Sequence, residues 1–142
     1  MKQDEIRRQQ RGMFTQLMNY AFDHNISVVS TNELPSDTPS ITLTELHKII
    51  LNNGWYRTRE IPFMLAHEIT HAVTNGPGEY YYNPRGYKSE NELMADHGAI
   101  DLLFRFTVDD PDFQPEYFNV IQFMESYMIP SCYRDYVEGL VN

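Results

Sequence analysis

Two histidines and a glutamate with fixed spacing stand near the middle of the chain, in the stretch His67-Glu68-Ile69-Thr70-His71. In an α-helix, residues four apart share one face, so His67 and His71 can direct their imidazole rings at a single ion. Zinc binds neutral imidazole nitrogens, and a catalytic zinc site combines three protein ligands with one open position. Glu68 would lie beside that open position, where a carboxylate can take a proton from water. The spacing therefore predicts a metal-dependent hydrolytic site.

The third ligand has to come from another part of the chain. The candidates downstream of His71 are five carboxylates and one imidazole, those of Glu79, Glu90, Glu92, Asp96, His97 and Asp101. Glu92 and Asp96 are four residues apart in a predicted helix and so share a face. This arrangement predicts Glu92 as the metal ligand. It predicts that Asp96 accepts the outer N–H of a ligand histidine and thereby orients the ring.

Each of these residues also has an ordinary structural interpretation. The helix around His67 is apolar on most sides, which is typical of a buried helix whether or not it binds a metal. Ser89 and Glu92 have the spacing of a capping box at the start of a helix. Glu90 and His97 are rival ligands on other faces of that helix. The combination of H-E-x-x-H with Glu92 and Asp96 favours the metal site, because buried imidazole and carboxylate groups need partners.

The order H-E-x-x-H, a loop, and then E-x-x-A-[N/D] on a second helix resembles the ImmA/IrrE family of zinc metallopeptidases. The resemblance covers about residues 47–105. It implies zinc ligands at His67, His71 and Glu92, the catalytic base at Glu68, and Asp96 at the position where the family has Asn or Asp. It also implies a phage or mobile-element enzyme that cuts a helix-turn-helix repressor, a protein substrate, at one site.

The chain departs from the usual pattern of this family in two places. Ile69-Thr70 stands where Leu-Gly is common between the histidines, and Gly98-Ala99-Ile100-Asp101 replaces a run of small and aromatic residues after the second motif. Both departures concern the shape of the cleft and the choice of substrate rather than the metal ligands. A peptide-cleaving zinc enzyme often needs a donor for the oxyanion of the reaction, and the loop between the two metal helices carries tyrosines within reach of such a role. For any single one of them, packing on the surface is the favoured interpretation. The candidates for that role are Tyr80, Tyr81, Tyr82 and Tyr87.

A second class of function fits the same residues. A protein that keeps the fold but does not cut can neutralise a repressor by contact, as an antirepressor or as a partner in a toxin–antitoxin pair. The two classes differ in whether zinc and Glu68 are required.

The helices and strands expected around these residues indicate an α+β fold in a single domain, residues 1–142. The resemblance implies a zincin-like arrangement of that domain. Apolar residues at helical spacing predict a first helix at 4–23, and short β-branched runs predict three strands. The strands are expected at 26–31, 41–43 and 47–52, and residues 79–88 are expected to form a loop. The two metal-binding helices are expected at about 60–74 and 89–106. Two further helices are expected at about 115–127 and 132–140.

Composition limits the location and the partners. The chain has 142 residues, a net charge of −9 and one cysteine, Cys132, so no internal disulfide is expected. The N-terminal segment lacks the apolar run of a secretory signal, and no stretch has the length of a membrane span, which together favour the cytoplasm. Direct nucleic-acid binding is disfavoured by the acidic balance. The short basic cluster of Arg7, Arg8 and Arg11 is interpreted as a solvated helix face.

Overall fold

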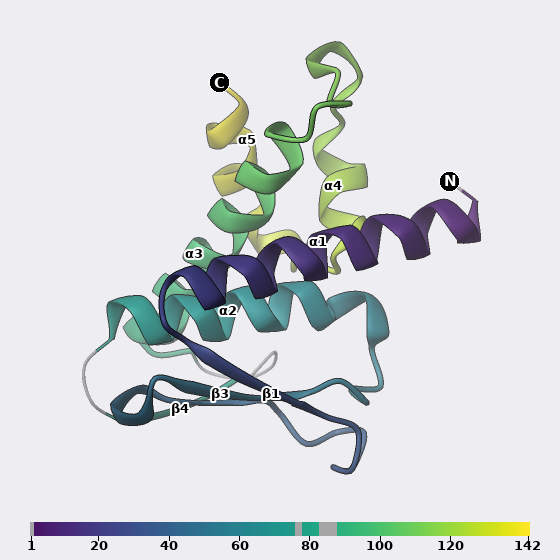
Figure 1. The fold of residues 1–142 in the computed structure, drawn as a ribbon. Helices are drawn as coiled ribbons and strands as arrows, with labels where there is room; N and C mark the ends of the chain where they lie inside the picture. Colours follow the sequence, from purple (N-terminus) through teal and green to yellow (C-terminus); the bar gives the residue numbers. More distant parts are fainter. Residues whose placement is uncertain (1, 76–77, 83–87) are drawn as a thin grey trace.

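The computed structural model describes residues 2–75, 78–82 and 88–142, and its architecture is built around the helix that carries the H-E-x-x-H motif (Figure 1). The α-helices in this part of the chain are α1 (Gln3–Asp23), α2 (Ile61–Thr74), α3 (Glu90–Val108), α4 (Val120–Ser126) and α5 (Arg134–Val141). The strands are β1 (Ser27–Thr31), β2 (Ile41–Leu43), β3 (Lys48–Asn52) and β4 (Glu79–Tyr81). α1 and the sheet lie on opposite sides of α2, so α2 runs through the centre of the molecule.

α2 is buried almost from end to end. Pro62 lies in its first turn, where the missing backbone N–H removes no helical hydrogen bond. Every residue from Pro62 to His71 is buried. The sheet contacts this helix on one side, and α1 and α3 contact it on the others. This packing explains why apolar side chains surround the helix axis, and it confirms the prediction that the motif lies in a buried helix.

The sheet has four strands among the described residues, and the prediction of three strands was wrong. The strand order is β1-β3-β2-β4. β1 pairs with β3 in parallel, and β2 pairs with both β3 and β4 in antiparallel orientation. β4 lies in the stretch that was predicted to be a loop. Three residues are too few for a recognisable alternation, so the pairing of β4 with β2 decides its conformation.

The long helices agree with the predictions to within two residues at each end. α1 begins at Gln3, and α3 runs from Glu90 to Val108. The C-terminal half differs more. The helix predicted at 115–127 is divided into a single 3₁₀ turn and α4, which begins only after Asn119. In the described part of the chain, no helix is both long and apolar enough to cross a membrane.

α2 and α3 approach each other closely where Gly98 faces Thr70. A Cβ atom placed on Gly98 would lie 2.4 Å from Thr70 Cγ2 and 2.7 Å from Thr70 Oγ1, well inside any normal contact distance. The two residues belong to the two segments in which the sequence departs from the ImmA/IrrE pattern. With Thr70 on α2, position 98 on α3 has no room for a side chain at this separation of the helices.

Candidate metal centre

The two histidines of α2 direct one ring nitrogen each towards a common point. His67 Nε2 and His71 Nε2 are 3.1 Å apart, and both side chains are fully buried. Two nitrogens that bind one zinc ion at tetrahedral angles are separated by about 3.3 Å, given zinc–nitrogen bonds of about 2.0–2.1 Å. The observed separation fits a shared ion. The spacing along one helix therefore produces the geometry that was expected of it.

Glu92 completes the group from α3. Its carboxylate oxygens lie 2.8 Å from His67 Nε2 and 3.0 Å from His71 Nε2. One ligand atom from each of His67, His71 and Glu92 lies within 4.8 Å of the others, so the three residues form a group that could hold a metal ion. Ser89 caps α3 at the same time, because its hydroxyl accepts a hydrogen bond from the backbone N–H of Glu92 at 3.3 Å. Both interpretations of Glu92 are therefore compatible. Its backbone N–H takes part in the helix cap, and its side chain belongs to the group that could hold a metal ion.

The rival ligands lie elsewhere. Glu90 is exposed at the start of α3. The ring of His97 stacks on Tyr136 with the centroids 4.2 Å apart, on another face of the helix. Asp101 accepts a hydrogen bond from the Tyr136 hydroxyl at 2.7 Å. Among the described residues, Glu92 is the carboxylate that lies close to both His67 and His71.

The outer nitrogens of both histidines are held by oxygen atoms. His67 Nδ1 donates to Asp96 Oδ1 at 2.8 Å, in the arrangement predicted for Asp96. Asp96 is fully buried, and its second oxygen accepts hydrogen bonds from Lys88 Nζ and from the hydroxyl of Tyr133. His71 Nδ1 donates to the side-chain oxygen of Asn75. With both outer nitrogens occupied as donors, the inner nitrogens are left as the atoms available to a metal.

Glu68 is buried beside this group and has one unsatisfied oxygen. Its Oε2 accepts a hydrogen bond from the hydroxyl of Thr42 on β2. Its Oε1 is buried and has no hydrogen-bond partner among the described residues. Burial raises the pKa of Glu68 to about 8, although the nearby His67 and the Thr42 hydroxyl act in the opposite direction. A raised pKa and an orphaned oxygen are features of a carboxyl group that is used for proton transfer.

Burial and hydrogen bonding act in opposite directions on His67 and Glu92. Burial disfavours the charged form of His67, yet the hydrogen bonds to Asp96 and Glu92 outweigh it and raise the pKa to about 9. Burial disfavours the charged form of Glu92 as well, yet the hydrogen bonds from His67 and His71 lower its pKa to about 2. In the metal-free molecule a proton therefore lies between His67 Nε2 and Glu92, at the place where a metal would bind.

Binding of a metal at about pH 7.5 is expected to release at least one proton per chain. His67 is protonated at that pH because its pKa is about 9, whereas a metal binds only the neutral imidazole. Glu92, with a pKa of about 2, is already ionised and releases none. Calorimetric titration with zinc in buffers of different ionisation enthalpy measures the number of protons. A binding heat that does not depend on the buffer would contradict this assignment.

Two of the four tyrosines considered for oxyanion stabilisation contact the histidines. Tyr80 on β4 stacks on the His71 ring with centroids 4.5 Å apart and an interplanar angle of 17°. Tyr82 is buried with its ring against the edge of His67, at 5.1 Å, and burial raises the pKa of its phenol. The side chain of Tyr81 and the whole of Tyr87 lie outside the described residues. Tyr80 is therefore the candidate that flanks the metal group from the sheet.

Four residues near the group were not predicted from the sequence: Thr42, Asn75, Lys88 and Tyr133. Asn75 carried a signal that could have revealed it, because it follows His71 by four residues, at the end of the same helix. Thr42 comes from a short strand and Tyr133 lies 37 residues after Asp96, so no spacing within one element indicates either contact.

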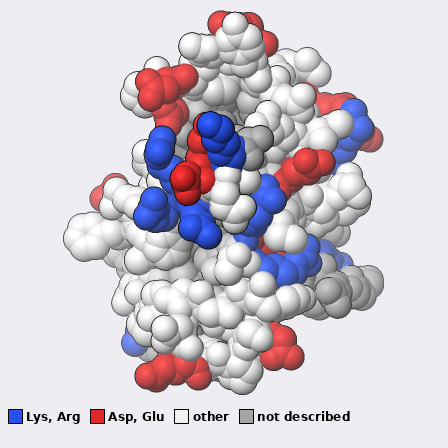
Figure 2. All heavy atoms as spheres, turned by 90° about the vertical axis from the view of Figure 1, so that its right-hand side faces the viewer, with Lys and Arg blue, Asp and Glu red and all other residues white. Residues whose placement is uncertain are grey.

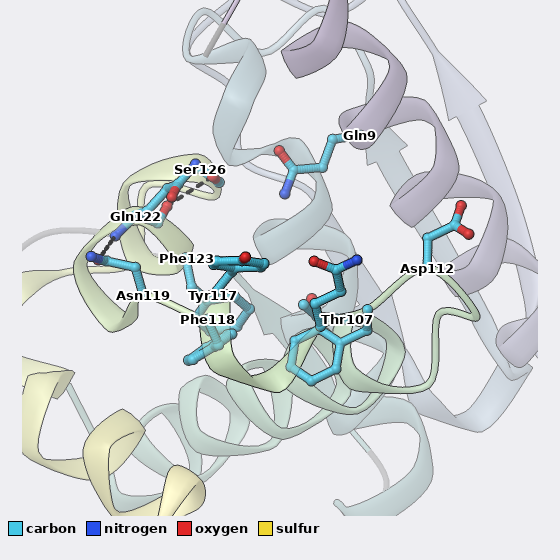
Figure 3. Close-up of a pocket in the computed structure, with 11 residues that line it drawn as sticks. Gln9, Thr107, Asp112, Tyr117, Phe118, Asn119, Gln122, Phe123 and Ser126 are labelled. Carbon is cyan, nitrogen blue, oxygen red and sulfur yellow. Dashed lines mark hydrogen bonds between the residues drawn. The ribbon is translucent and has the colours of Figure 1, made fainter.

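A separate cavity of about 310 Å³ lies between α1 and the segment that connects α3 with α4 (Figure 3). Aromatic rings and amides line it, including Phe118, Phe123, Gln9 and Asn119, together with one carboxylate, Asp112. None of the described residues lining it carries an imidazole, and no residue of the metal group reaches it. The candidate site is therefore placed at the metal group.

No protein-family model, curated protein or solved structure matches this chain. The likeness to the ImmA/IrrE family consequently depends on the two motifs alone.

Proposed function

We propose that this chain is a zinc-dependent endopeptidase of the ImmA/IrrE type, with a zincin-like arrangement of its metal helices. One observation carries the proposal. His67, His71 and Glu92 converge on one point, and Glu68, in the same helix as the two histidines, has one buried carboxyl oxygen without a hydrogen-bond partner among the described residues. Among common metals, zinc suits a set of two imidazoles and one carboxylate, and this set leaves one position for water or substrate.

The residues around the point of convergence have separate tasks in this proposal. When bound, zinc supplies a Lewis acid that polarises a carbonyl group and lowers the pKa of water to about 7. His67 and His71 would hold it through Nε2, and Glu92 through its carboxylate. Asp96 and Asn75 keep the two rings oriented. Glu68 accepts a proton from the attacking water and passes it to the leaving amine, while Thr42 holds the other carboxylate oxygen in place.

The substrate is proposed to be a protein, a helix-turn-helix repressor, and the site of action the cytoplasm. The edge of the sheet supports an extended segment as the part that is cut. β4 is the last strand in the order β1-β3-β2-β4 and is paired with β2. An extended peptide can add a strand to such an edge through backbone hydrogen bonds. Tyr80, which belongs to β4, stacks on His71, so a segment bound there would pass close to the metal group.

The first test is the zinc content of the purified chain, measured by elemental analysis. We expect about one zinc per chain, in keeping with a single three-ligand site. Glu92→Ala is expected to weaken zinc binding by at least about 100-fold. Loss of a residue that only orients a ligand already costs about 10–100-fold in metal affinity, and Glu92 is proposed as a ligand itself. Glu90→Ala is the matched control, since Glu90 is exposed two positions away on the same helix.

The opposite outcome is equally informative. If the wild-type chain takes up no zinc even after reconstitution, the H-E-x-x-H segment is a buried structural helix, and the non-cleaving binding module becomes the better interpretation.

A further inference from the structure

Lys and Arg side chains gather on the face of the molecule where α1 begins, with Asp and Glu side chains among them (Figure 2). A cavity of about 510 Å³ opens there, between the first turns of α1 and the 3₁₀ turn Thr58–Glu60 that leads into α2. Its polar lining consists of the arginines Arg7, Arg11 and Arg59 together with Gln3, Gln10 and Thr58. Two segments that are about fifty residues apart in the sequence therefore contribute guanidinium groups to one cavity.

Within the part of the chain that the structure describes, the three arginines of the cavity form no ion pair. None of the ion pairs among the described residues includes Arg7, Arg11 or Arg59, whereas Arg57 and Arg134 each pair with a glutamate. No carboxylate from the described residues lines the cavity. The chain has 20 acidic and 11 basic residues, so a cluster of unpaired arginines is unexpected on composition alone. Like charges repel, and a bound anion would offset the repulsion among these guanidinium groups.

The lining favours a particular kind of anion. Every charged group in it is a planar guanidinium, which binds phosphate oxygens in pairs. The hydroxyl of Thr58 and the amide of Gln3 add uncharged hydrogen-bonding groups, whereas the amide nitrogen of Gln10 already donates to Ser126 O at 2.6 Å. A tetrahedral phosphate presents oxygens in several directions and carries nearly two negative charges. A single carboxylate presents two oxygens in one plane and one charge, so it would leave some of these groups without a partner.

We propose that this cavity binds a compact, phosphate-bearing small molecule. Its volume falls in the range of small-molecule pockets, which is about 300–1,000 Å³. Its apolar wall is Ile6, and none of the described residues lining it is aromatic, so the stacking platform of a single-stranded nucleic-acid site is missing. The net charge of −9 also opposes a long polyanion. These features favour a small anion over a nucleic-acid strand as the ligand of the cavity.

The site is distinct from the metal group. No residue of His67, His71 and Glu92 lines the cavity. The 3₁₀ turn that lines the cavity leads into α2 at Ile61. His67 follows six positions later, which is about 9 Å further along the helix axis. Anion binding here can be measured whether or not the chain is a peptidase, and zinc content, measured on the same preparation before EDTA treatment, reports on the other site.

The test is a calorimetric titration of the EDTA-treated chain with inorganic pyrophosphate. We expect saturable binding of about one pyrophosphate per chain with a dissociation constant of about 1 mM or lower. Arg59→Gln and Arg7→Gln are each expected to weaken it by at least about tenfold, since each removes charge-assisted hydrogen bonds. Arg134→Gln removes the same charge from an exposed position paired with Glu138, and it should leave binding unchanged. Circular dichroism of all variants verifies that they are folded.

Three results would overturn the proposal. The first is the absence of saturable binding. The second is binding that survives unchanged in both cavity variants, which would place pyrophosphate elsewhere on the molecule. The third is tighter binding of an acidic peptide or a single-stranded oligonucleotide than of pyrophosphate, lost in the same variants, which would assign the cavity to a macromolecular partner. Acetate at equal ionic strength serves as the control for a single carboxylate and is expected not to bind.

Discussion

Replacement of Glu68 by glutamine is expected to leave zinc bound and to reduce peptide-bond hydrolysis by about 10²–10⁴-fold, the usual contribution of a general base. Glutamine has nearly the same shape and can still accept the hydrogen bond from Thr42. It cannot accept a proton from water. The measurement is cleavage of the proposed repressor substrate, followed as a time course, together with zinc per chain on the same preparation.

Glu90→Gln is the matched control for this variant, because it removes a carboxylate from an exposed position near the site and should cut at the wild-type rate. Two outcomes would count against the mechanism. Unchanged turnover in Glu68→Gln would exclude Glu68 as the base. Full antirepression by Glu68→Gln without any cleavage would favour the binding module, in which contact with the repressor is enough.

Replacement of Gly98 by alanine is expected to lower the free energy of unfolding by about 1–3 kcal/mol, the usual cost of adding a methyl group to a filled interface. The new Cβ would lie 2.4 Å from Thr70 Cγ2, so α2 and α3 would have to move apart. A loss of stability is unusual for this substitution, since glycine to alanine inside a helix normally raises the free energy of unfolding by about 0.5–1 kcal/mol. Urea unfolding followed by circular dichroism gives the value.

Gly12→Ala, in α1, is the control, because a Cβ at Gly12 meets nothing within 4 Å and should stabilise. The double variant Thr70→Ala/Gly98→Ala tests the cause. It removes Cγ2 and Oγ1 of Thr70, the two atoms nearest to the new Cβ, and leaves the Cβ contact at 3.1 Å, so most of the lost stability should return. If the two substitutions are additive, the contact between Thr70 and Gly98 is not what limits position 98.

Several features of the site were predictable because they depend on spacing within one helix. His67 and His71 lie on one face at four-residue spacing, and Glu92 and Asp96 repeat that spacing on α3. The burial of α2 was predictable as well, since apolar residues surround the motif. The group of His67, His71 and Glu92 that the sequence predicted is the group that the structure brings together. The roles in catalysis and the resemblance to a peptidase family stay predictions.

Other features were decided only when the elements packed against one another. The sequence could not exclude Glu90 or His97 as ligands, because the choice depends on which face of α3 is turned towards α2. It did not indicate that Thr42 would hold Glu68, that Tyr133 would reach Asp96, or that Glu79–Tyr81 would form a fourth strand.

The physical reason for this division is the range of the interactions. A helix repeats every 3.6 residues, so relations within it are encoded locally. Contacts between elements depend on their relative placement, and local periodicity does not specify that placement. The pairing of Thr70 with Gly98 illustrates the difference: each residue appeared in the sequence as a separate departure from a family pattern, and only the packing of α2 on α3 relates them.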